Sequence, residues 1–530
     1  MTDNEPYDVI VIGSGNAGLS AAASAAHHLG PGARILVLEK APREWAGGNS
    51  TFTAGAYRTV FHGLEDVLPL VSNVSEEQAS RIDMNAYSEE DFMADLMRVT
   101  DGQADPELAK VLVQESRPTT HWLHQNGIRF NLSFHRQAYT IAQRQKFWGG
   151  MVLAVQQGGK GLIQQHLANI SRLNITVLYN SPVTALLSTA ECITGVTISP
   201  NPGPGYNVYA LGGIVLAAGG FEANKSLRRQ HLGPAWVKAY VRGTPYNTGD
   251  LLTTSLNLPK HLRAVSFGDW AGCHSTCWDA NASPTVGDLA LTNQYTKSGY
   301  PLGLMINVDG ERFVDEGEDM RNYTYAKFGR AILHQPEGVA FQLWDADGAG
   351  WLRGEEYSRD VVERIEAETL EELVVKLESK GLRSPMMFLE TVAEYNNAVH
   401  EFQLENERDG GKVVFDPSIK DGLSTTSSKG GLKLGPDKTN WALPIIKGPF
   451  LAVKVTCGIT FTFGGLKTCP QTAGVISEST GKTIPGLYVA GEMVGGLFYK
   501  NYPGGSGLTS GAVFGRKAGL EAAKRAKAMS

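Results

Sequence analysis

The hydrophobic pattern at the start of the chain predicts a strand, a helix and a second strand, in that order. Asp8–Ile12 is a short β-branched run, which is typical of a buried strand. The Ala-rich segment Leu19–Leu29 predicts a helix, and Arg34–Leu38 is a second apolar run of the strand type. The chain therefore opens with two strands joined through one helix.

The turn between the first strand and the helix carries a glycine pattern. Gly13-Ser14-Gly15-Asn16-Ala17-Gly18 is G-x-G-x-x-G, and Glu39 follows the second strand. The first glycine allows the tight turn, the second lets a pyrophosphate approach the backbone, and the third lets the helix lie close to the strand. The helix N-terminus would face the phosphates, and Glu39 would accept hydrogen bonds from a ribose diol. In this context the pattern predicts a dinucleotide site.

Further along the chain the pattern alternates between helices and strands. Helices are expected over about 89–126 and 158–170, and short strands over 174–179, 183–188, 193–199 and 206–211. Gly213–Ala217 is a buried strand that ends in Ala218-Gly219-Gly220. A buried strand with a glycine turn returns at Gly486–Glu492, and Gly504–Gly507 opens a last helix over Leu508–Lys527.

The composition changes between about Ser266 and Val455. Tryptophan, charged helices such as Asp360–Lys380, and a Gly- and Lys-rich loop at Ser427–Lys438 dominate there. A chain of 530 residues is long enough for two domains or more. We therefore expect an α/β fold in which residues 1–265 and 456–530 bind the dinucleotide, while residues 266–455 form an inserted α+β capping (substrate) domain.

Charge and cysteine usage exclude several classes of protein. The net charge of −6 argues against nucleic-acid binding, and no apolar run approaches the roughly 20 residues that span a bilayer. Met1–Glu5 is acidic and lacks the apolar segment of a secretory signal. The five cysteines form no C-x-x-C, haem or zinc pattern, and the run Cys273–Cys277 lacks a second cluster. We expect free thiols, no metal and a cytoplasmic location.

Several distant glycine segments favour a flavin over a nicotinamide cofactor. Ile214–Gly220 would bring backbone to a ligand without side chains in the way, and Gly249-Asp250 opens a helix. Ala490-Gly491-Glu492 and Gly504–Gly507 add further close-approach backbone. The positive end of the last helix would favour hydride acceptance at flavin N5. Each glycine alone could be only a turn, but together with the N-terminal pattern they predict FAD.

Longer motifs resemble the flavoproteins of the fumarate reductase and succinate dehydrogenase superfamily. Gly13–Gly18, Glu39-Lys40 and Gly47-Gly48-Asn49-Ser50 resemble the FAD domain of that group. Gly310–Glu316 resembles its capping-domain signature, and Ile484–Glu492 its C-terminal flavin signature. The resemblance implies a Rossmann-like FAD-binding domain of the glutathione-reductase type.

Within that group the chain is most similar to the tricarballylate dehydrogenase branch, through runs like Thr53–Ala56, Arg312–Gly329 and Asn501–Gly505. The resemblance and the glycine turns together give the expected FAD contacts. These are Gly13, Gly15, Asn16, Ala17, Gly18, Glu39, Lys40, Gly47, Gly48, Asn49, Ser50, Ala54, Gly55, Val183, Ala218, Gly219, Asp250, Gly491, Glu492, Ser506, Gly507, Leu508 and Thr509. The histidine that carries FAD covalently in some relatives would lie near Asn49–Thr53, where there is none, so we expect noncovalent FAD.

The resemblance also implies catalytic residues. Arg321 aligns with the arginine that fumarate reductases use for proton transfer, although the two relay positions behind it read Lys297 and Tyr300 here. The alternative for Arg321 is a surface ion pair with Glu316, Glu318 or Asp319. His274 and Thr276 lie where the group has a substrate-facing His-x-Thr; the alternative for His274 is a structural role.

Two departures from the group bear on the substrate. Phe461 stands in place of a substrate-binding histidine, and Tyr502 in place of a carboxylate-binding arginine. Losing two cationic contacts argues against fumarate or succinate, because the charge of a buried dicarboxylate would be uncompensated. Tyr502-Pro503-Gly504-Gly505 also resembles 3-ketosteroid dehydrogenases, in which a tyrosine and a glycine N–H polarise a ketone. The alternative for Tyr502 is a ring packed over the flavin.

We therefore expect catalytic roles for Arg321, Tyr502, His274 and Thr462, and substrate contacts from Arg58, Phe461, Tyr323, Tyr325 and Gly505. The expected function is an FAD-dependent dehydrogenase that desaturates, or reduces, a C–C bond next to the carboxylate or ketone of a small acid. One alternative is a cyclic-ketone desaturase of the ketosteroid type. Another is a non-catalytic flavin-binding protein. No haem or Fe–S motif identifies the electron acceptor, which could be oxygen, a quinone or another protein.

Overall fold

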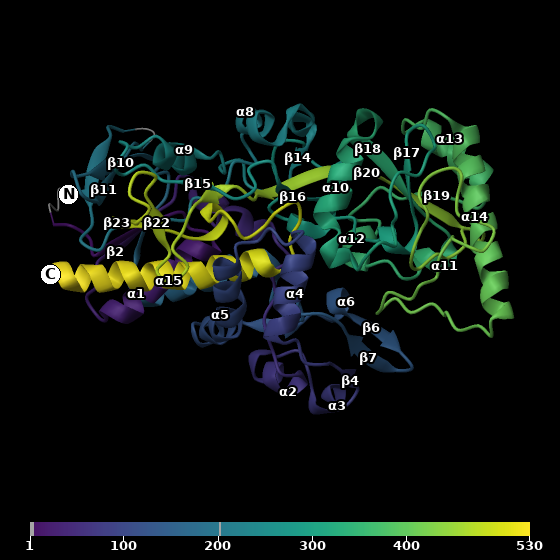
Figure 1. Ribbon diagram of the computed structural model, residues 1–530, viewed down its shortest axis with the longest axis horizontal. Helices are drawn as coiled ribbons and strands as arrows, with labels where there is room; N and C mark the ends of the chain where they lie inside the picture. Colours follow the sequence, from purple (N-terminus) through teal and green to yellow (C-terminus); the bar gives the residue numbers. More distant parts are fainter. Residues whose placement is uncertain (1–4, 201–202) are drawn as a thin grey trace. The chain divides into compact units, whose positions relative to one another are not determined.

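The computed structural model describes residues 5–200 and 203–530, which divide into two units (Figure 1). The first unit contains the residues up to Pro234 together with Gly243–His274 and Thr460–Ser530. The second unit contains Ala235–Arg242 and Ser275–Ile459. Polypeptide from both ends of the chain therefore builds the first unit, and the second is inserted between them.

The first unit is built on a six-stranded sheet with the order β22-β23-β13-β1-β2-β9. Its strands are β1 (Val9–Ile12), β2 (Ile35–Leu38), β9 (Thr176–Leu178), β13 (Ile214–Leu216), β22 (Gly474–Ile476) and β23 (Thr483–Val489). All neighbouring pairs are parallel except β22 with β23, and Ile10 lies between Leu36 and Ile214. β1, β2 and β13 are buried throughout, as expected for strands covered on both faces.

Two helices from opposite ends of the chain pack against each other in this unit. α1 (Asn16–Leu29) is rich in alanine, and α15 (Ser506–Met529) carries glycines at positions 511, 515 and 519 (Figure 1). A Cβ atom at Gly515 or Gly519 would overlap backbone carbonyl groups of α1. Spacing by four residues places these glycines on one face, so the two helix backbones approach each other closely.

The remainder of the first unit surrounds this centre. Its longer helices are α4 (Glu89–Val99), α5 (Pro106–Gln125), α7 (Gly158–Arg172) and α9 (Asp250–Leu256). One antiparallel sheet contains β10 (Val183–Ser188), β11 (Ile193–Ile198) and β12 (Tyr206–Tyr209). A second small sheet has the order β3 (Ala56–Tyr57), β8 (Leu153–Val155), β5 (Phe130–Leu132). A third has the order β4 (Ile82–Asp83), β7 (Arg144–Phe147), β6 (Ala138–Ile141). The strands β15 (Ser266–Phe267) and β21 (Gly465–Leu466) form a two-stranded sheet.

The second unit has a sheet of its own, centred on the long strand β20 (Phe450–Thr462), whose last residues enter the first unit. The order is β14 (Tyr240–Val241), β20, β18 (Val339–Trp344), β17 (Leu304–Asn307); β16 (Cys273–Asp279) and β19 (Ile365–Ala367) also pair with β20. Its longer helices are α10 (Tyr325–Leu333), α13 (Leu370–Glu378) and α14 (Pro385–Arg408). The pairs β17–β18, β18–β20 and β19–β20 are antiparallel and β14–β20 is parallel, so the second unit combines a mixed sheet with helices.

One expected helix is wrong. Residues 360–380 do not form a single charged helix, because Ile365–Ala367 pairs with Phe450–Ala452 as the strand β19, and α13 begins only at Leu370. Tertiary pairing overrides the local preference at this position. None of the helices in the described residues has the length and apolar character needed to cross a membrane.

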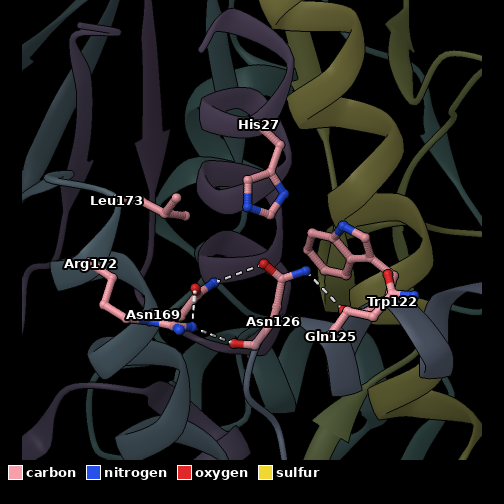
Figure 2. A pocket seen from close by; sticks show the side chains of 7 residues that line it. All are labelled: His27, Trp122, Gln125, Asn126, Asn169, Arg172 and Leu173. Atoms are coloured by element: carbon pink, nitrogen blue, oxygen red, sulfur yellow. Dashed lines mark hydrogen bonds between the residues drawn. The ribbon is translucent and has the colours of Figure 1, made fainter. Parts of the chain in front are cut away.

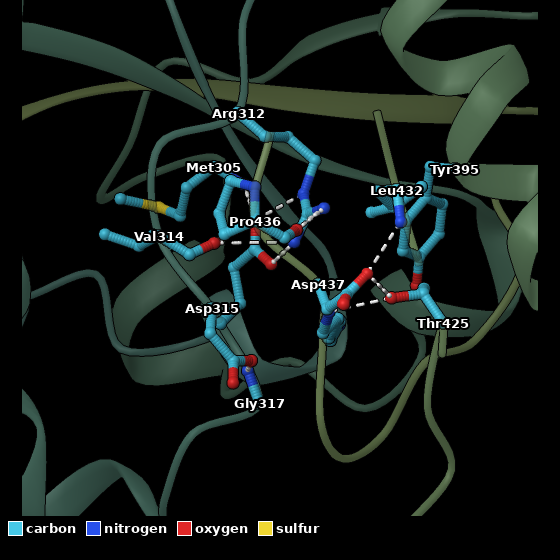
Figure 3. Close-up of polar contacts among 12 residues, drawn as sticks. Met305, Arg312, Val314, Asp315, Gly317, Tyr395, Thr425, Leu432, Pro436 and Asp437 are labelled. Atoms are coloured by element: carbon cyan, nitrogen blue, oxygen red, sulfur yellow. Dashed lines mark hydrogen bonds and ion pairs between the residues drawn. The ribbon is translucent and has the colours of Figure 1, made fainter. Parts of the chain in front are cut away.

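The motif Gly310–Glu316 forms a buried polar centre in the second unit (Figure 3). Arg312 donates to both oxygens of Glu316, at 3.2 and 2.5 Å, and to the carbonyl of Pro436. Asp437, next to Pro436, accepts from the Leu432 amide at 2.7 Å. Burial lowers the pKa of the nearby Lys438 amine to about 8. This motif therefore anchors the Gly- and Lys-rich loop.

Candidate active site

The G-x-G-x-x-G turn joins β1 to α1 at the carboxyl end of the parallel sheet. Gly13 has a φ of +105°, which disfavours other residues, and a Cβ at Gly18 would overlap the carbonyl oxygen of Gly13. α1 begins after Gly15 without a side-chain cap and without an acidic residue in its first turn. Asn16, the first residue of α1, donates its N–H to Ser50, and the N–H groups of Ala17 and Gly18 that follow are placed as in a phosphate-binding helix.

Glu39 lies at the end of β2, directly beside this turn. One carboxylate oxygen accepts from the Ser14 N–H at 3.0 Å and the Ser14 hydroxyl at 2.6 Å, and the other accepts from the Ala41 N–H at 2.9 Å. A carboxylate has about four acceptor positions, so one direction is left for a ribose hydroxyl. Glu39 fixes the turn as well as offering a ligand contact.

The segment from Gly47 to Gly55 connects the first turn to the last helix. Ser50 Oγ accepts from the Asn16 N–H at 3.1 Å, and the Asn16 amide donates to the Leu508 carbonyl at 2.8 Å. The Tyr57 hydroxyl donates to Asn16 Oδ1 at 2.7 Å. These bonds hold the start of α1, the polar segment and the start of α15 in one assembly.

The remaining expected FAD contacts lie mostly at the carboxyl ends of neighbouring parallel strands. Ala218 and Gly219 follow β13, and Gly491 and Glu492 follow β23, whose residues pair with those of β13. The others are at the start of α9, where Asp250 binds Lys40, and at Val183, the first residue of β10. Ligands of open α/β sheets bind at this edge.

α15 offers a second helix N-terminus. Like α1, it begins after a glycine, Gly505, with no side-chain cap and no acidic residue in the first turn. The Ser506 hydroxyl donates to the Pro503 carbonyl and the Thr509 hydroxyl to the Arg58 carbonyl, so both side chains brace the turn. Two uncapped helix starts and glycine-lined backbone between them fit a dinucleotide with a flavin at one end.

Glu492 and Thr462 are bonded to each other. Glu492 Oε1 accepts from the Thr462 N–H at 2.7 Å and from its hydroxyl at 3.1 Å. Burial raises the pKa of the Glu492 carboxyl to about 7, and the bonds from Thr462 oppose this rise. Thr462, expected as a catalytic residue, is thus engaged in holding a cofactor-site carboxyl.

Five aromatic rings meet next to the start of α15. The ring centroids of His274 and Tyr502 lie 4.7 Å apart, and those of Phe461 and Tyr502 lie 5.1 Å apart. Phe463 and Phe498 complete the group, which we call the aromatic cluster. A Cβ at Gly507 would lie 3.7 Å from Phe461 and 3.9 Å from Tyr502, so both rings lie at the helix start.

The sequence pointed to three members of the aromatic cluster, His274, Phe461 and Tyr502. It missed Phe463 and Phe498. Phe463 could have been found from its spacing of two residues after Phe461 on an extended segment, which places both rings on one side. Phe498 carries no such signal, because it lies in an irregular segment.

Arg58 does not fit its expected role as a contact to a substrate acid. Its guanidinium is fully buried, and it donates to the Gly504 carbonyl at 2.9 Å, the Tyr87 hydroxyl at 2.7 Å and Asp95 at 3.0 Å. Its N–H also bonds the Gly505 carbonyl at 3.4 Å. These contacts indicate that Arg58 supports the turn that opens α15.

Arg321, Tyr323 and Tyr325 belong to the second unit. Arg321 and Tyr323 form a short 3-10 turn just before α10, and the Arg321 carbonyl accepts from the Tyr300 hydroxyl at 3.4 Å. Of the carboxylates weighed as ion-pair partners for Arg321, Glu316 binds Arg312 and Glu318 binds Lys327. Lys297 is buried 3.8 Å from Asp279, and burial lowers the pKa of its amine.

A pocket of about 360 Å³ lies in the first unit (Figure 2). It is lined by His27, Trp122, Gln125, Asn126, Asn169, Arg172 and Leu173. His27 is near the C-terminal end of α1, about 18 Å along the helix from Gly15 at 1.5 Å per residue. Asn169 and Arg172 bond to Asn126, so much of the polar lining is satisfied within the protein.

This geometry defines an FAD-binding flavoprotein, and comparison with known proteins agrees. The model of the FAD binding domain family matches residues 8–508, so the chain belongs to that family. A probable fumarate reductase from Shewanella frigidimarina is 26% identical over 99% of this chain and 76% of its own length. The 4-oxocyclohex-2-ene-1-carboxylate 5-dehydrogenase of Sinomonas cyclohexanicum is 26% identical over 71% of this chain and 61% of its own length.

A solved structure of 3-ketosteroid Δ1-dehydrogenase from Sterolibacterium denitrificans has the same fold. The TM-score is 0.68 at 19% identity, covering 98% of this chain and 99% of that one. The family match and the fumarate reductase relatives confirm the superfamily and the FAD cofactor expected from the sequence, and the solved structure agrees with the expected fold class. The protein is a fumarate reductase-like FAD oxidoreductase acting on CH–CH groups.

Proposed function

We propose that the protein desaturates a C–C bond next to the carbonyl of a ring ketone. The observation that supports this most strongly is the aromatic cluster at the start of α15. Its members are His274, Phe461, Phe463, Phe498 and Tyr502, and none of them is a lysine or an arginine. Such walls favour a flat, largely apolar substrate with a few polar contacts.

The charge of the site argues against a small polycarboxylate, which was the first expectation from the tricarballylate dehydrogenase resemblance. A carboxylate that enters an aromatic-walled site must lose its hydration without gaining a bidentate partner, and this costs several kcal/mol per uncompensated charge. Arg58, a cation near this turn, already binds Asp95, Tyr87 and the Gly504 carbonyl, and Lys500 binds Asp101. A neutral ketone needs only hydrogen-bond donors.

The donors that a ketone needs are present in the turn. The Tyr502 hydroxyl belongs to the aromatic cluster, and the Gly507 N–H, in the first turn of α15, follows it five residues later; the Ser506 N–H donates to the Pro503 carbonyl. Donors at a ketone oxygen stabilise the negative charge that develops there when the α-proton leaves. Bound FAD supplies the hydride acceptor, N5, for the hydrogen of the β-carbon.

The base for the α-proton is assigned here by resemblance. Arg321 is the candidate, with Tyr323 and Tyr325 next to it in the sequence. An arginine is normally always charged, so its action as a base needs a neighbour that takes the proton onward. Arg321→Ala is expected to lower kcat while leaving FAD content unchanged.

The relative from Sinomonas cyclohexanicum favours the same substrate class, since its name describes a six-membered ring that carries both a ketone and a carboxylate. Ring ketones that carry a single carboxylate are therefore candidate substrates, together with simple ring ketones. A polycarboxylate without a ring is the competing class, supported by the fumarate reductase relatives.

The proposal is tested with Tyr502→Phe, assayed by steady-state dehydrogenation of saturated ring ketones with an artificial electron acceptor. Loss of the hydroxyl is expected to lower kcat by about 10²–10³, the usual effect of removing one oxyanion donor. Tyr488→Phe is the control, because its hydroxyl donates only weakly, at 3.4 Å, to the Glu521 carbonyl. Equal turnover of the wild type and Tyr502→Phe would rule out this role for Tyr502.

A further inference from the structure

The side chain of Asn16, the first residue of α1, joins the two helix starts of the FAD site. Asn16 is buried, and its Nδ2 donates to the carbonyl of Leu508, the third residue of α15, at 2.8 Å. A Cβ at Gly511, three residues further along α15, would lie 3.0 Å from Asn16 Nδ2, so the glycine makes room for the amide. The start of α1 is therefore tied to the start of α15 through one buried amide.

Two further side chains meet the other end of this amide. The Tyr57 hydroxyl, from β3, lies 2.7 Å from Asn16 Oδ1, and His166 Nε2, from α7, lies 3.1 Å from the same oxygen. Tyr57 is 0% exposed and His166 is 2% exposed. The oxygen of an amide has two lone pairs, so the two side chains together fill its acceptor capacity. Four elements that are separate in the sequence therefore meet at Asn16.

The Leu508 carbonyl fixes which way the amide of Asn16 points. A carbonyl oxygen only accepts, so the amide atom that faces Leu508 is the nitrogen, and the oxygen faces Tyr57 and His166. Both of these side chains must then donate. Burial raises the pKa of the Tyr57 hydroxyl, which keeps its proton, and lowers the pKa of the His166 imidazole to about 4. His166 is thus neutral at physiological pH and carries its single proton on Nε2.

A buried histidine can be merely part of an apolar core, and His166 does lie on the buried face of α7 with Leu162, Ile163 and Ile170. A leucine would fill such a position without the cost of burying a polar ring. The imidazole instead bonds a residue of the glycine turn, as the Tyr57 hydroxyl does. This shared contact separates both side chains from simple core packing.

We propose that Tyr57 and His166 are positioning residues for FAD, which hold the Asn16 amide in the orientation that ties α15 to α1. When either donor is lost, the amide can rotate, and the Leu508 carbonyl loses its bond. The two helix starts then depart from the separation that suits the cofactor. The inference rests on the FAD site and not on the substrate, so it can fail or hold independently of the ring-ketone proposal.

The affinity of the apoprotein for FAD tests this role. Tyr57→Phe and His166→Leu each remove one donor and are expected to raise the Kd about fivefold, as for the loss of one hydrogen bond. His166→Gln retains an amide donor and is expected to bind FAD within about twofold of the wild type. A wild-type Kd in Tyr57→Phe would overturn the proposal, even if His166→Leu does not fold. Binding as weak in His166→Gln as in His166→Leu would contradict the role of His166.

Tyr395→Phe, in the second unit, is the matched control. The Tyr395 side chain is likewise 0% exposed, and its hydroxyl donates to the Leu443 carbonyl at 2.8 Å. Urea denaturation of the apoproteins should show that Tyr395→Phe and Tyr57→Phe lose similar stability, while only Tyr57→Phe binds FAD more weakly. An equal rise of the Kd in both variants would mean a general structural effect and would refute positioning.

A double-mutant cycle tests whether Tyr57 acts through Asn16. Asn16→Ala removes the shared acceptor, so adding Tyr57→Phe to it should change the Kd for FAD by less than about twofold. A further fivefold rise of the Kd in the double variant would show that Tyr57 acts by another route, and the proposal would then be wrong.

Discussion

Replacing Arg58 by methionine tests whether this buried arginine supports the start of α15. The side chain of Arg58 is 0% exposed and that of its partner Asp95 is 17% exposed. The substitution removes the bonds to Asp95, to the Tyr87 hydroxyl and to the Gly504 carbonyl. It also leaves the Gly504 carbonyl without its donor, directly before the first turn of α15.

The expected cost follows from the burial of this pair. Removing one partner of a buried ion pair costs about 3–5 kcal/mol, because the other charge stays buried and uncompensated. Asp95 keeps bonds from the Tyr87 hydroxyl at 2.7 Å and from Arg98 at 3.2 Å, which places Arg58→Met near the lower limit, about 3 kcal/mol. A displaced helix start should also weaken FAD binding by about tenfold, which is 1.4 kcal/mol.

Both effects are measured by urea denaturation followed through flavin fluorescence, and by titration of the protein with FAD. The control is Arg144→Met, since Arg144 binds both oxygens of Asp83 while the two side chains are 46% and 50% exposed. An exposed pair contributes up to about 1 kcal/mol. The reasoning is refuted if Arg58→Met is no more destabilising than Arg144→Met and binds FAD as the wild type does.

Three further predictions concern the cofactor site. Gly18→Ala should abolish FAD binding, because its Cβ would overlap the Gly13 carbonyl oxygen; the flavin absorbance of the purified variant measures this. Acid precipitation should leave the yellow colour in the supernatant, as expected for noncovalent FAD, and colour in the pellet would contradict it. Burial raises the Glu492 pKa from 4.5 to about 7, so stability should fall as pH rises from about 4.5 to 7. Between pH 5 and pH 8 the free energy of unfolding of Glu492→Gln should fall by roughly 3 kcal/mol less than that of the wild type, at 1.4 kcal/mol per pKa unit. Denaturation of both proteins at the two pH values measures this.

The sequence predicted the parts of the fold whose signal is local. The turn Gly13–Gly18 carries its own backbone requirements, and the strand before Glu492 and the helix after Gly505 have strong apolar patterns. The strand Ile365–Ala367 could not be predicted in this way, because pairing with β20 gives it its conformation. The sequence of a short charged segment does not indicate which strand it will pair with.

The site was predictable to a similar degree. Residues within motifs were found, but their partners were not, since partners are brought in from distant segments. Asp95 lies 37 residues from Arg58, and nothing in the sequence indicates that this pair is buried. The bond from the Thr462 N–H to the Glu492 carboxyl, 30 positions later, likewise depends on how separate strands are brought together.

The central claim is that the aromatic-walled site oxidises a ring ketone, and anaerobic titration of the FAD-loaded protein without an added acceptor tests it most directly. A saturated cyclohexanone, with and without a ring carboxylate, and tricarballylate are added in parallel while the flavin absorbance is followed. The account predicts that a ring ketone bleaches the flavin and that tricarballylate leaves it yellow. Bleaching by tricarballylate with no response to either ketone would contradict the account.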